Sequence, residues 1–341
     1  MKKTFKVAAV AAAGVLTLAG CSGDSDNEDN VTVVGYSVLE SANENLFKAF
    51  EGTDAGDGVT FDGPSYGASG EQSRGVADGQ DADLVHFSLE PDMTRLVDAG
   101  IVAEDWKDND TKGICTQSVV VMVVQKGNPK GIQDWSDLVR DDVSVVTPNP
   151  ASSGSAKWNL LAAYGDVIAG GGSEEEAAAY MTELFDHVAA LPDSGRDATT
   201  AFTSGTGDVL LSYENEAILA RQNGEDFDYV IPPTTLLIEN PCAATEDAPE
   251  AASAFLDFQK SAEGQKLYAE TGFRPLVDEG DLEVEGANDP ADPFPAPTTM
   301  LTIDGDFDGW GSANSLYFGD GQDGNPLGIL TDIQQSSGAG S

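Results

Sequence analysis

The chain has 341 residues, and its 59 Asp and Glu against 17 Lys and Arg give a formal net charge of −42. A surface this acidic repels phosphate backbones and anionic headgroups, so the composition excludes nucleic acid as a partner and argues against membrane binding through charge. Hydrophobic residues make up 40% of the chain, which is enough for the core of one large or two medium-sized domains.

The first 20 residues have the order of a secretory signal. Lysines precede an apolar run at residues 7–18, which leads into a small-residue box that ends at Cys21. The apolar run is too short to span a membrane comfortably. We therefore expect a signal peptide at residues 1–20, a lipid on Cys21 that anchors the protein to the cell membrane, and a flexible tether at residues 21–30.

Beyond the tether, short β-branched apolar runs alternate with segments of helical periodicity. Several runs are apolar at every position, as expected for strands that are covered on both faces. Such alternation predicts an α/β fold with mainly parallel sheets, in which ligands bind beyond the carboxyl ends of strands. The strands are expected at Val31–Val34, Val59–Phe61, Leu84–Phe87, Val119–Val124, Val143–Val146, Val209–Leu211, Tyr229–Ile231 and Leu236–Ile238. The helices are expected at Asn43–Phe50, Glu71–Asp78, Asp92–Asp98, Trp135–Arg140, Ala156–Ile168, Glu174–Val188, Glu214–Arg221, Pro249–Lys260 and Ala262–Thr271.

The composition changes near the C-terminus. Residues 276–341 are acidic and rich in Pro and Gly and end in a partly apolar stretch, so we expect them to wrap around the domains as an extension. Residues 304–309 have the start of a calcium loop, but its twelfth position is Ser315 rather than Glu, and a solvated acidic loop is the better interpretation. His86 and His187 lack partners at metal-ligand spacing, so no metal or cofactor is expected.

Two cysteines remain if Cys21 carries a lipid. In an oxidising exterior, Cys115 and Cys242 are more often bonded to each other than free. Two buried, inert thiols are the alternative. Mass spectrometry with and without reductant distinguishes the two states.

Three short turns rich in Ser and Gly each lie just before a helical pattern. A single turn of this kind is usually no more than a helix cap. Three of them in one acidic chain offer backbone N–H groups and hydroxyls, which can hold a small anion without a cation. We therefore predict one anion site that combines all three turns. The turns are Gly67–Gly70, Ser152–Ser155 and Asp193–Arg196.

Longer stretches around these turns carry a family resemblance, which covers most of residues 31–275. The stretches are Ser65–Gln72, Lys126–Ile132, Asp134–Trp135, Thr147–Pro150, Ser153–Gly154, Lys157–Asn159, Asp193–Gly195, Gly207–Leu210, Glu214–Ala217 and Gly272–Pro275. In their order and spacing they resemble the sulfate-binding proteins of ABC importers, which belong to the periplasmic binding protein class.

The resemblance implies two α/β lobes of the type II arrangement, joined by a hinge that the chain crosses twice. The first lobe would comprise residues 31–116 and 241–275, and the second lobe residues 117–240. Cys115 and Cys242 would then face each other beside the hinge. A bond between them would limit splaying of the lobes without blocking their closure.

The resemblance also implies a set of neutral donors for a dehydrated sulfate. Ser69 would provide its hydroxyl and its N–H, and Ser153 its hydroxyl. Gly154 and Ser155 would provide backbone N–H groups, and the third turn would add one from Gly195 or the next residue. Sulfate is fully ionised at neutral pH and needs only donors, whereas phosphate can keep a proton that requires an acceptor.

The chain departs from the family at several of these positions. Ser155 stands where family members often have Gly, Tyr213 where they have Trp, and Ser37 where they have Asp. Tyr213 can still donate through its hydroxyl, but over a different distance than an indole N–H. Arg196 is an addition, and it could either contact the anion or take part in a surface ion pair.

The resemblance implies a lipid-anchored receptor, not an enzyme, that captures sulfate and delivers it to a membrane permease driven by an ATPase. Within the same class, the ligand could instead be thiosulfate, molybdate or phosphate. From a different class, a secreted hydrolase could use Ser69 or Ser153 as its nucleophile. That alternative lacks a base at recognisable spacing, and the chain has no Gly-x-Ser-x-Gly elbow.

Overall fold

The computed structural model describes residues 30–277, 280, 282–322 and 325–338. The expected signal peptide, the lipidation site Cys21 and nearly all of the tether lie outside these residues. Within the described ranges, every helix is too short or too polar to cross a membrane.

Strands and helices alternate along the described residues, as the sequence periodicity predicted. The strands are β1 (Val33–Tyr36), β2 (Ser65–Gly67), β3 (Leu84–His86), β4 (Ile114–Gln125), β5 (Val145–Val146), β6 (Val188–Ala190), β7 (Val209–Tyr213), β8 (Phe227–Val230), β9 (Thr234–Ala244) and β10 (Thr299–Leu301). The helices are the 3-10 helices η1 (Ser37–Leu39) and η2 (Trp135–Val139) together with α1 (Glu40–Glu51), α2 (Ser69–Ala77), α3 (Glu90–Asp98), α4 (Gly154–Ala169), α5 (Glu174–Asp186), α6 (Gly195–Thr203), α7 (Glu214–Gln222), α8 (Glu250–Lys260), α9 (Ala262–Glu270), α10 (Ile303–Asp306), α11 (Gly309–Phe318) and α12 (Ile329–Ser337).

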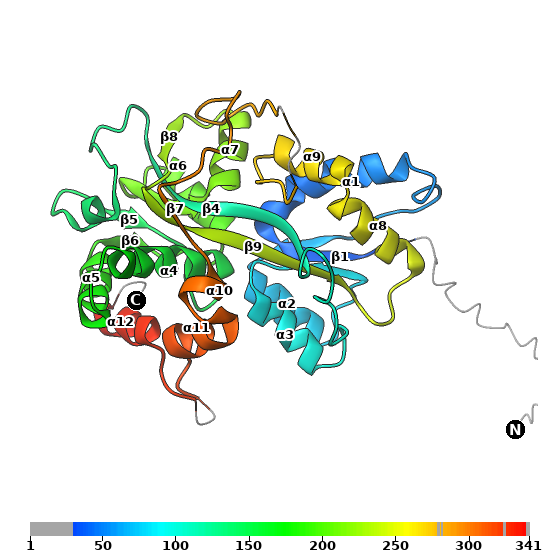
Figure 1. Cartoon of the computed structure of the whole chain (residues 1–341), viewed down its shortest axis with the longest axis horizontal. Helices are drawn as coiled ribbons and strands as arrows, with labels where there is room; N and C mark the ends of the chain where they lie inside the picture. The colour runs from blue at the N-terminus through cyan, green and yellow to red at the C-terminus, as the bar shows by residue number, and fades with distance from the viewer. Residues whose placement is uncertain (1–29, 278–279, 281, 323–324, 339–341) are drawn as a thin grey trace, which may run out of the picture.

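Two α/β lobes are joined by the long strands β4 and β9 (Figure 1). These strands pair with each other between the lobes, and then each continues into one lobe: β9 pairs with β3 in the first lobe, and β4 pairs with β7 and β8 in the second. The strand order is β2-β1-β3-β9-β4-β7-β5-β6. The two-lobe α/β fold with two crossovers is thereby confirmed.

The strand β4 explains why one of the predicted runs is apolar at every position. Val120, Met122 and Val124 face one hydrophobic core, while the alternate residues Val119 and Val121 face another. Both faces of the strand are therefore covered, and alternation of polar and apolar residues is absent. The expectation of mainly parallel pairing holds within each lobe, where β1 pairs with β2 and β3, and β5 with β6 and β7. The linking strands pair antiparallel because the chain crosses the hinge once in each direction.

Several elements differ from the sequence prediction, and three of them are informative. The expected strand at 59–61 is only an isolated bridge at Thr60, and the Phe61 ring stacks on Phe47 of α1 with the ring centres 4.0 Å apart. The strand in this region is β2. The helix expected to reach Val188 ends at Asp186, and β6 begins there. The helix expected at 135–140 is a 3-10 helix that ends one residue earlier.

The C-terminal residues contain helices and a strand that the sequence analysis did not predict. β10 pairs parallel with β9, and α12 packs against α5, so this segment lies along the second lobe (Figure 1). In α11, buried Trp310, Ala313, Tyr317 and Phe318 have the spacing of one helical face. The Trp310 ring meets Trp158 of α4 edge-on at 4.7 Å. These apolar contacts fix the segment to the second lobe.

A buried ion pair holds the second lobe to the chain that returns from it. The Arg274 guanidinium donates to both carboxylate oxygens of Glu214, at 2.6 and 3.1 Å. Glu214 is fully buried at the start of α7, and burial raises the pKa of its carboxyl while Arg274 opposes that shift. Arg274 also donates to the Pro295 carbonyl at 3.1 Å. One side chain thus links the hinge region, the second lobe and the C-terminal segment.

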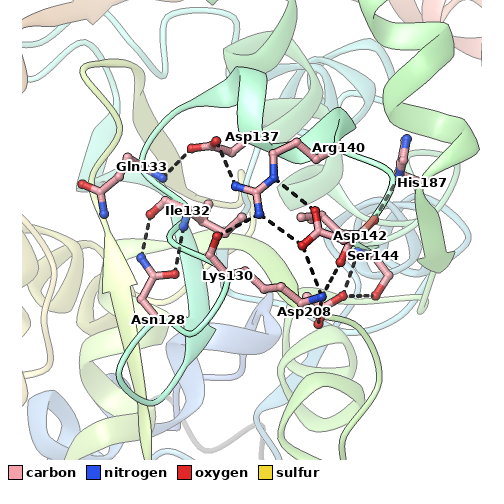
Figure 2. A network of polar contacts seen from close by, with 11 residues as sticks. Asn128, Lys130, Ile132, Gln133, Asp137, Arg140, Asp142, Ser144, His187 and Asp208 are labelled. Carbon is pink, nitrogen blue, oxygen red and sulfur yellow. Dashed lines mark hydrogen bonds and ion pairs between the residues drawn. The ribbon is translucent and has the colours of Figure 1, made fainter.

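Figure 2 shows a polar network that fixes the loop between β4 and β5. Arg140 donates to the Lys130 carbonyl at 2.8 Å and to the Asp142 carboxylate at 3.2 Å. Asp208, next to β7, accepts from Ser144 Oγ at 2.7 Å and lies 3.8 Å from Lys130 Nζ. This loop includes two of the stretches that carry the family resemblance, Lys126–Ile132 and Asp134–Trp135. Its contacts here tie it to the sheet of the second lobe.

Cys115 on β4 and Cys242 on β9 form a disulfide, with their Cα atoms 5.8 Å apart. Both side chains are buried. The bond therefore connects the two strands that link the lobes, on the side of the first lobe.

Candidate functional site

A small cavity lies between the lobes, and its lining is entirely uncharged. Its free volume is about 10 Å³, which is room for about one water molecule. Ser and Gly predominate, and neither Lys and Arg nor Asp and Glu contribute to the lining. The lining residues are Tyr36, Ser37, Val38, Gly67, Ala68, Ser69, Ser88, Ser153, Gly154, Ser155, Ser194 and Gly195.

Four helical segments begin at this cavity. They are α2 and η1 of the first lobe, with η1 running directly into α1, and α4 and α6 of the second. The first backbone N–H groups of a helix have no partner within the helix, and the aligned peptide dipoles make this end positive. The cavity therefore combines N–H donors and favourable potential from both lobes. These are the properties of an anion site.

Two serine hydroxyls at the cavity have no protein partner among the described residues. Ser153 precedes α4 as its N-cap, yet its side chain does not cap the helix. Ser37 is the first residue of η1, and its hydroxyl likewise makes no hydrogen bond to the described residues. Ser153 is nearly buried, with an exposed fraction of 4%. Both hydroxyls are therefore available to donate to a guest in the cavity.

The Ser69 hydroxyl, by contrast, is already committed. It donates to Asp92 Oδ2 at 2.6 Å and accepts from the Ser88 N–H at 2.9 Å. The other Asp92 oxygen accepts from Arg95 at 3.1 Å. The sequence analysis assigned both the hydroxyl and the N–H of Ser69 to the ligand, but in this arrangement only the N–H remains. Asp92 is held behind Ser69 and does not line the cavity.

The two lobes meet directly beside the cavity. Ser88 of the first lobe shares a hydrogen bond of 2.7 Å with the Tyr213 hydroxyl of the second, and its carbonyl accepts from the Trp158 indole at 2.9 Å. Gly154 lies so close to Ser88 that a Cβ at this position would meet Ser88 Oγ at 2.5 Å. The N-terminus of α4 can approach the first lobe only because residue 154 has no side chain.

Tyr213 and Arg196, which the sequence analysis placed in the ligand set, do not line the cavity. The Tyr213 hydroxyl bonds to Ser88 and also interacts with Ser155, and burial raises its pKa. Arg196 donates from Nε to Glu216 Oε1 at 3.1 Å. Because Glu216 is buried, the Arg196 side chain is directed to a carboxylate inside the second lobe. Gly195, the residue before Arg196, lines the cavity instead.

The geometry gives no support to a serine nucleophile. His86 is buried with Nε2 3.2 Å from Thr116 Oγ1, and His187 Nδ1 is 3.0 Å from the Val143 carbonyl. Burial lowers the pKa of His86 to about 3. Neither imidazole bonds to Ser69 or Ser153, so neither is placed to accept a proton from them. Among the described residues there is also no group of His, Cys, Asp and Glu that could hold a metal ion.

The sequence analysis missed several lining residues, of which Ser88 is the most informative. Ser88 follows β3 and precedes α3, and it bonds to both lobes. It stands at the carboxyl end of a strand that pairs parallel with β1. That position is the general location of ligands in such sheets and was the available signal. Tyr36, at the end of β1, has the same relation to the cavity.

Comparisons with known proteins agree with this geometry. The family model for bacterial extracellular solute-binding proteins matches residues 31–274. A sulfate-binding protein of Synechococcus elongatus is 40% identical over 332 residues, which cover 92% of this chain and 93% of the relative. A thiosulfate-binding protein of Pseudomonas aeruginosa is 33% identical over 335 residues, with coverage of 94% and 97%. The solved structure of the sulfate-binding protein SubI from Mycobacterium tuberculosis has 48% identity and a TM-score of 0.78, covering 84% of this chain and 98% of that one.

These matches confirm the resemblance to sulfate-binding proteins, and the relatives are solute-binding proteins rather than enzymes. The family model alone spans both lobes and the two linking strands. The chain therefore belongs to the family of bacterial extracellular solute-binding proteins.

Proposed function

We propose that this chain captures sulfate in the cavity between its lobes and delivers it to an ABC import permease. The observation that carries the proposal is the convergence of helix N-termini and two unpartnered serine hydroxyls on an uncharged cavity. A dianion that leaves water must recover its hydrogen bonds, and these groups are donors. The names of the relatives from Synechococcus and Mycobacterium support sulfate as the ligand.

The position of Asp92 supports sulfate over phosphate. Protonated phosphate needs an acceptor in its site, and a carboxylate is the usual one. Among the described residues, two carboxylates are hydrogen-bonded to cavity-lining serines, and neither lines the cavity. Asp92 already accepts from Ser69 and Arg95, and Asp197 accepts from Ser194. A proton on the ligand would therefore meet donors rather than an acceptor.

Thiosulfate is the second candidate. It is also a tetrahedral dianion, and the relative from Pseudomonas aeruginosa is named for it. Its terminal sulfur is larger and a weaker acceptor than oxygen. A site built from hydrogen-bond donors therefore favours sulfate.

We infer the working cycle from the two-lobe architecture. The first lobe, residues 31–116 and 241–275, and the second lobe, residues 117–240, would close on the anion by bending at β4 and β9. The Ser88–Tyr213 contact would form only on closure. The segment 276–341 would move with the second lobe, to which it is packed.

We also propose that the protein is held at the membrane by a lipid on Cys21 after removal of residues 1–20. The support is the order of basic, apolar and small residues at the N-terminus. Intact mass spectrometry of the membrane fraction would detect the lipid. A Cys21→Ser variant should be released into the medium, and retention of that variant at the membrane would contradict the anchor.

Titration calorimetry on the mature protein tests the ligand. We expect one sulfate per chain, weaker binding of thiosulfate and molybdate, and weaker binding still of phosphate. If phosphate bound more tightly than sulfate, the assignment of the cavity as a donor-only site would be wrong.

A further inference from the structure

We propose that a second site for a small anion lies where α3, α4 and α11 meet, with Lys157 and Arg95 as its cationic groups. A cavity of about 660 Å³ opens here. The 149–153 loop contributes residues to both cavities, Asn149 to this one and Ser153 to the first. Its lining includes Arg95, Lys157, Asn149, Asn314 and Phe318.

Lys157 lies at this cavity without a carboxylate partner among the described residues. Its ammonium donates to Asn314 Oδ1 at 2.7 Å and lies 5.1 Å from the centre of the Phe318 ring. An amide and a ring face leave much of the charge of an ammonium uncompensated. Burial lowers the pKa of Lys157 to about 8, so the group is mostly charged at neutral pH. A half-buried cation of this kind is the natural partner of an anion.

Other cations reinforce the positive potential. Arg95 and Arg74 both act on Lys157 electrostatically and disfavour its charged form, while Asp92 favours it. Asp92 is a shared partner, because its oxygens already accept from Arg95 and Ser69. With Asp320 in the lining, three cations therefore stand against two carboxylates, in a chain whose net charge is −42. In so acidic a protein, such a cluster calls for a specific reason.

The groups of this site come from three parts of the molecule (Figure 1). Arg95 belongs to α3 of the first lobe and Lys157 to α4 of the second, while Asn314 belongs to α11 of the C-terminal segment. Closure of the lobes therefore brings like charges together. An anion between them would offset this repulsion and favour the closed form. By linkage, it should raise the affinity of the first cavity, and sulfate there should raise the affinity of the second.

The lining limits the ligand to a small oxyanion or carboxylate. It combines two cations and one carboxylate, Asp320, with amide groups such as Asn149. A net charge of about one unit and neutral donors suit a mono- or dianion, whereas a polyanion would find too few cations. Because its cations reside on different lobes, this site differs from the first cavity, which is uncharged and relies on helix N-termini.

Two-step calorimetry on the mature protein tests the inference, using inorganic phosphate and then succinate as probes. The protein is first saturated with sulfate, and phosphate is then titrated into the sulfate-bound form. We expect millimolar binding that is weakened at least tenfold by Lys157→Met. The matched control is Lys266→Met, which removes an exposed lysine from α9 and should leave the second step unchanged. Succinate distinguishes carboxylate binding from oxyanion binding at the same lysine.

The two steps separate the proposals. Absence of sulfate binding in the first step would contradict the proposed function without bearing on the second site, which is then titrated in the free protein. The second site is ruled out if phosphate and succinate both fail to bind, or if they bind equally well to Lys157→Met. Retention of tight sulfate binding by Lys157→Met establishes that this variant is folded, and Arg95→Gln provides an independent variant with the same expected loss.

Discussion

The substitution Ser153→Ala examines the proposed site most directly, because it removes one donor and little else. The Ser153 hydroxyl has no protein partner among the described residues, so its loss leaves no other group unsatisfied. A hydrogen bond to a charged ligand contributes about 1–3 kcal/mol, which corresponds to a roughly 5- to 150-fold rise in the dissociation constant of sulfate. The stability of the free protein should change by less than about 0.5 kcal/mol. Calorimetry and urea unfolding measure the two quantities.

Ser173→Ala is the matched control, because Ser173 is also the N-cap of a helix. Its hydroxyl does cap α5, accepting from the Glu176 N–H at 3.2 Å, and it is absent from the cavity lining. This variant should lose about 0.5–2 kcal/mol of stability and keep its sulfate affinity. If Ser153→Ala behaved like Ser173→Ala, with lower stability and unchanged affinity, the assignment of Ser153 to the ligand would be refuted.

Three further predictions follow from contacts near the cavity and the hinge. Gly154→Ala should weaken sulfate binding at least tenfold and enlarge the protein in solution scattering, because a Cβ there would clash with Ser88. The control is Gly311→Ala in α11, whose Cβ would have no neighbour within 4 Å and which does not line the cavity; it should bind sulfate normally, and equal effects of the two variants would contradict the close approach of the lobes. Arg274→Met should lower the free energy of unfolding by about 3–5 kcal/mol, because it leaves Glu214 buried without its cation. The double variant with Glu214→Gln should recover part of that loss in chemical unfolding. A loss below about 1 kcal/mol for Arg274→Met would argue against the buried pair. Burial lowers the pKa of His86 to about 3 in the folded protein, whereas it is near 6.5 in the unfolded chain, so protons favour the unfolded state and stability falls as the pH drops below 6.5. By pH 4.5 this residue costs about 3 kcal/mol of unfolding free energy. His86→Gln should remove that loss from the pH profile of unfolding, and an unchanged profile would show that His86 titrates normally.

The alternation of apolar runs and helical segments was sufficient to predict the α/β fold. It failed where side chains found partners outside a sheet. The run around Phe61 has strand composition, but its ring packs against Phe47 and Phe255, and no strand forms. The C-terminal helices were missed for a related reason. The apolar face of α11 is short and lies among Gly, Ser and Asn, and its packing on Trp158 and Tyr164 of α4 stabilises it as a helix.

The candidate site was predictable in part, because its turns precede helices and helix starts offer free donors. The stretches around Ser69, Ser153 and Gly195 could be recognised from this pattern, and all three residues line the cavity. The partners of those residues could not be predicted. Nothing in the sequence indicates that the Ser69 hydroxyl donates to Asp92, 23 residues away, or that Arg196 is directed to Glu216.

The sequence by itself determined the elements, the family and the small residues of the anion-binding turns, because periodicity, helix starts and Ser-Gly composition are local properties. The tertiary structure alone decided which hydroxyls remain free, which cations gather at Lys157 and how closely Gly154 approaches Ser88. These features depend on contacts between segments that lie far apart in the sequence, in some cases by more than 100 residues. Such contacts arise only when β4 and β9 bring the two lobes together, so no local pattern in the chain encodes them.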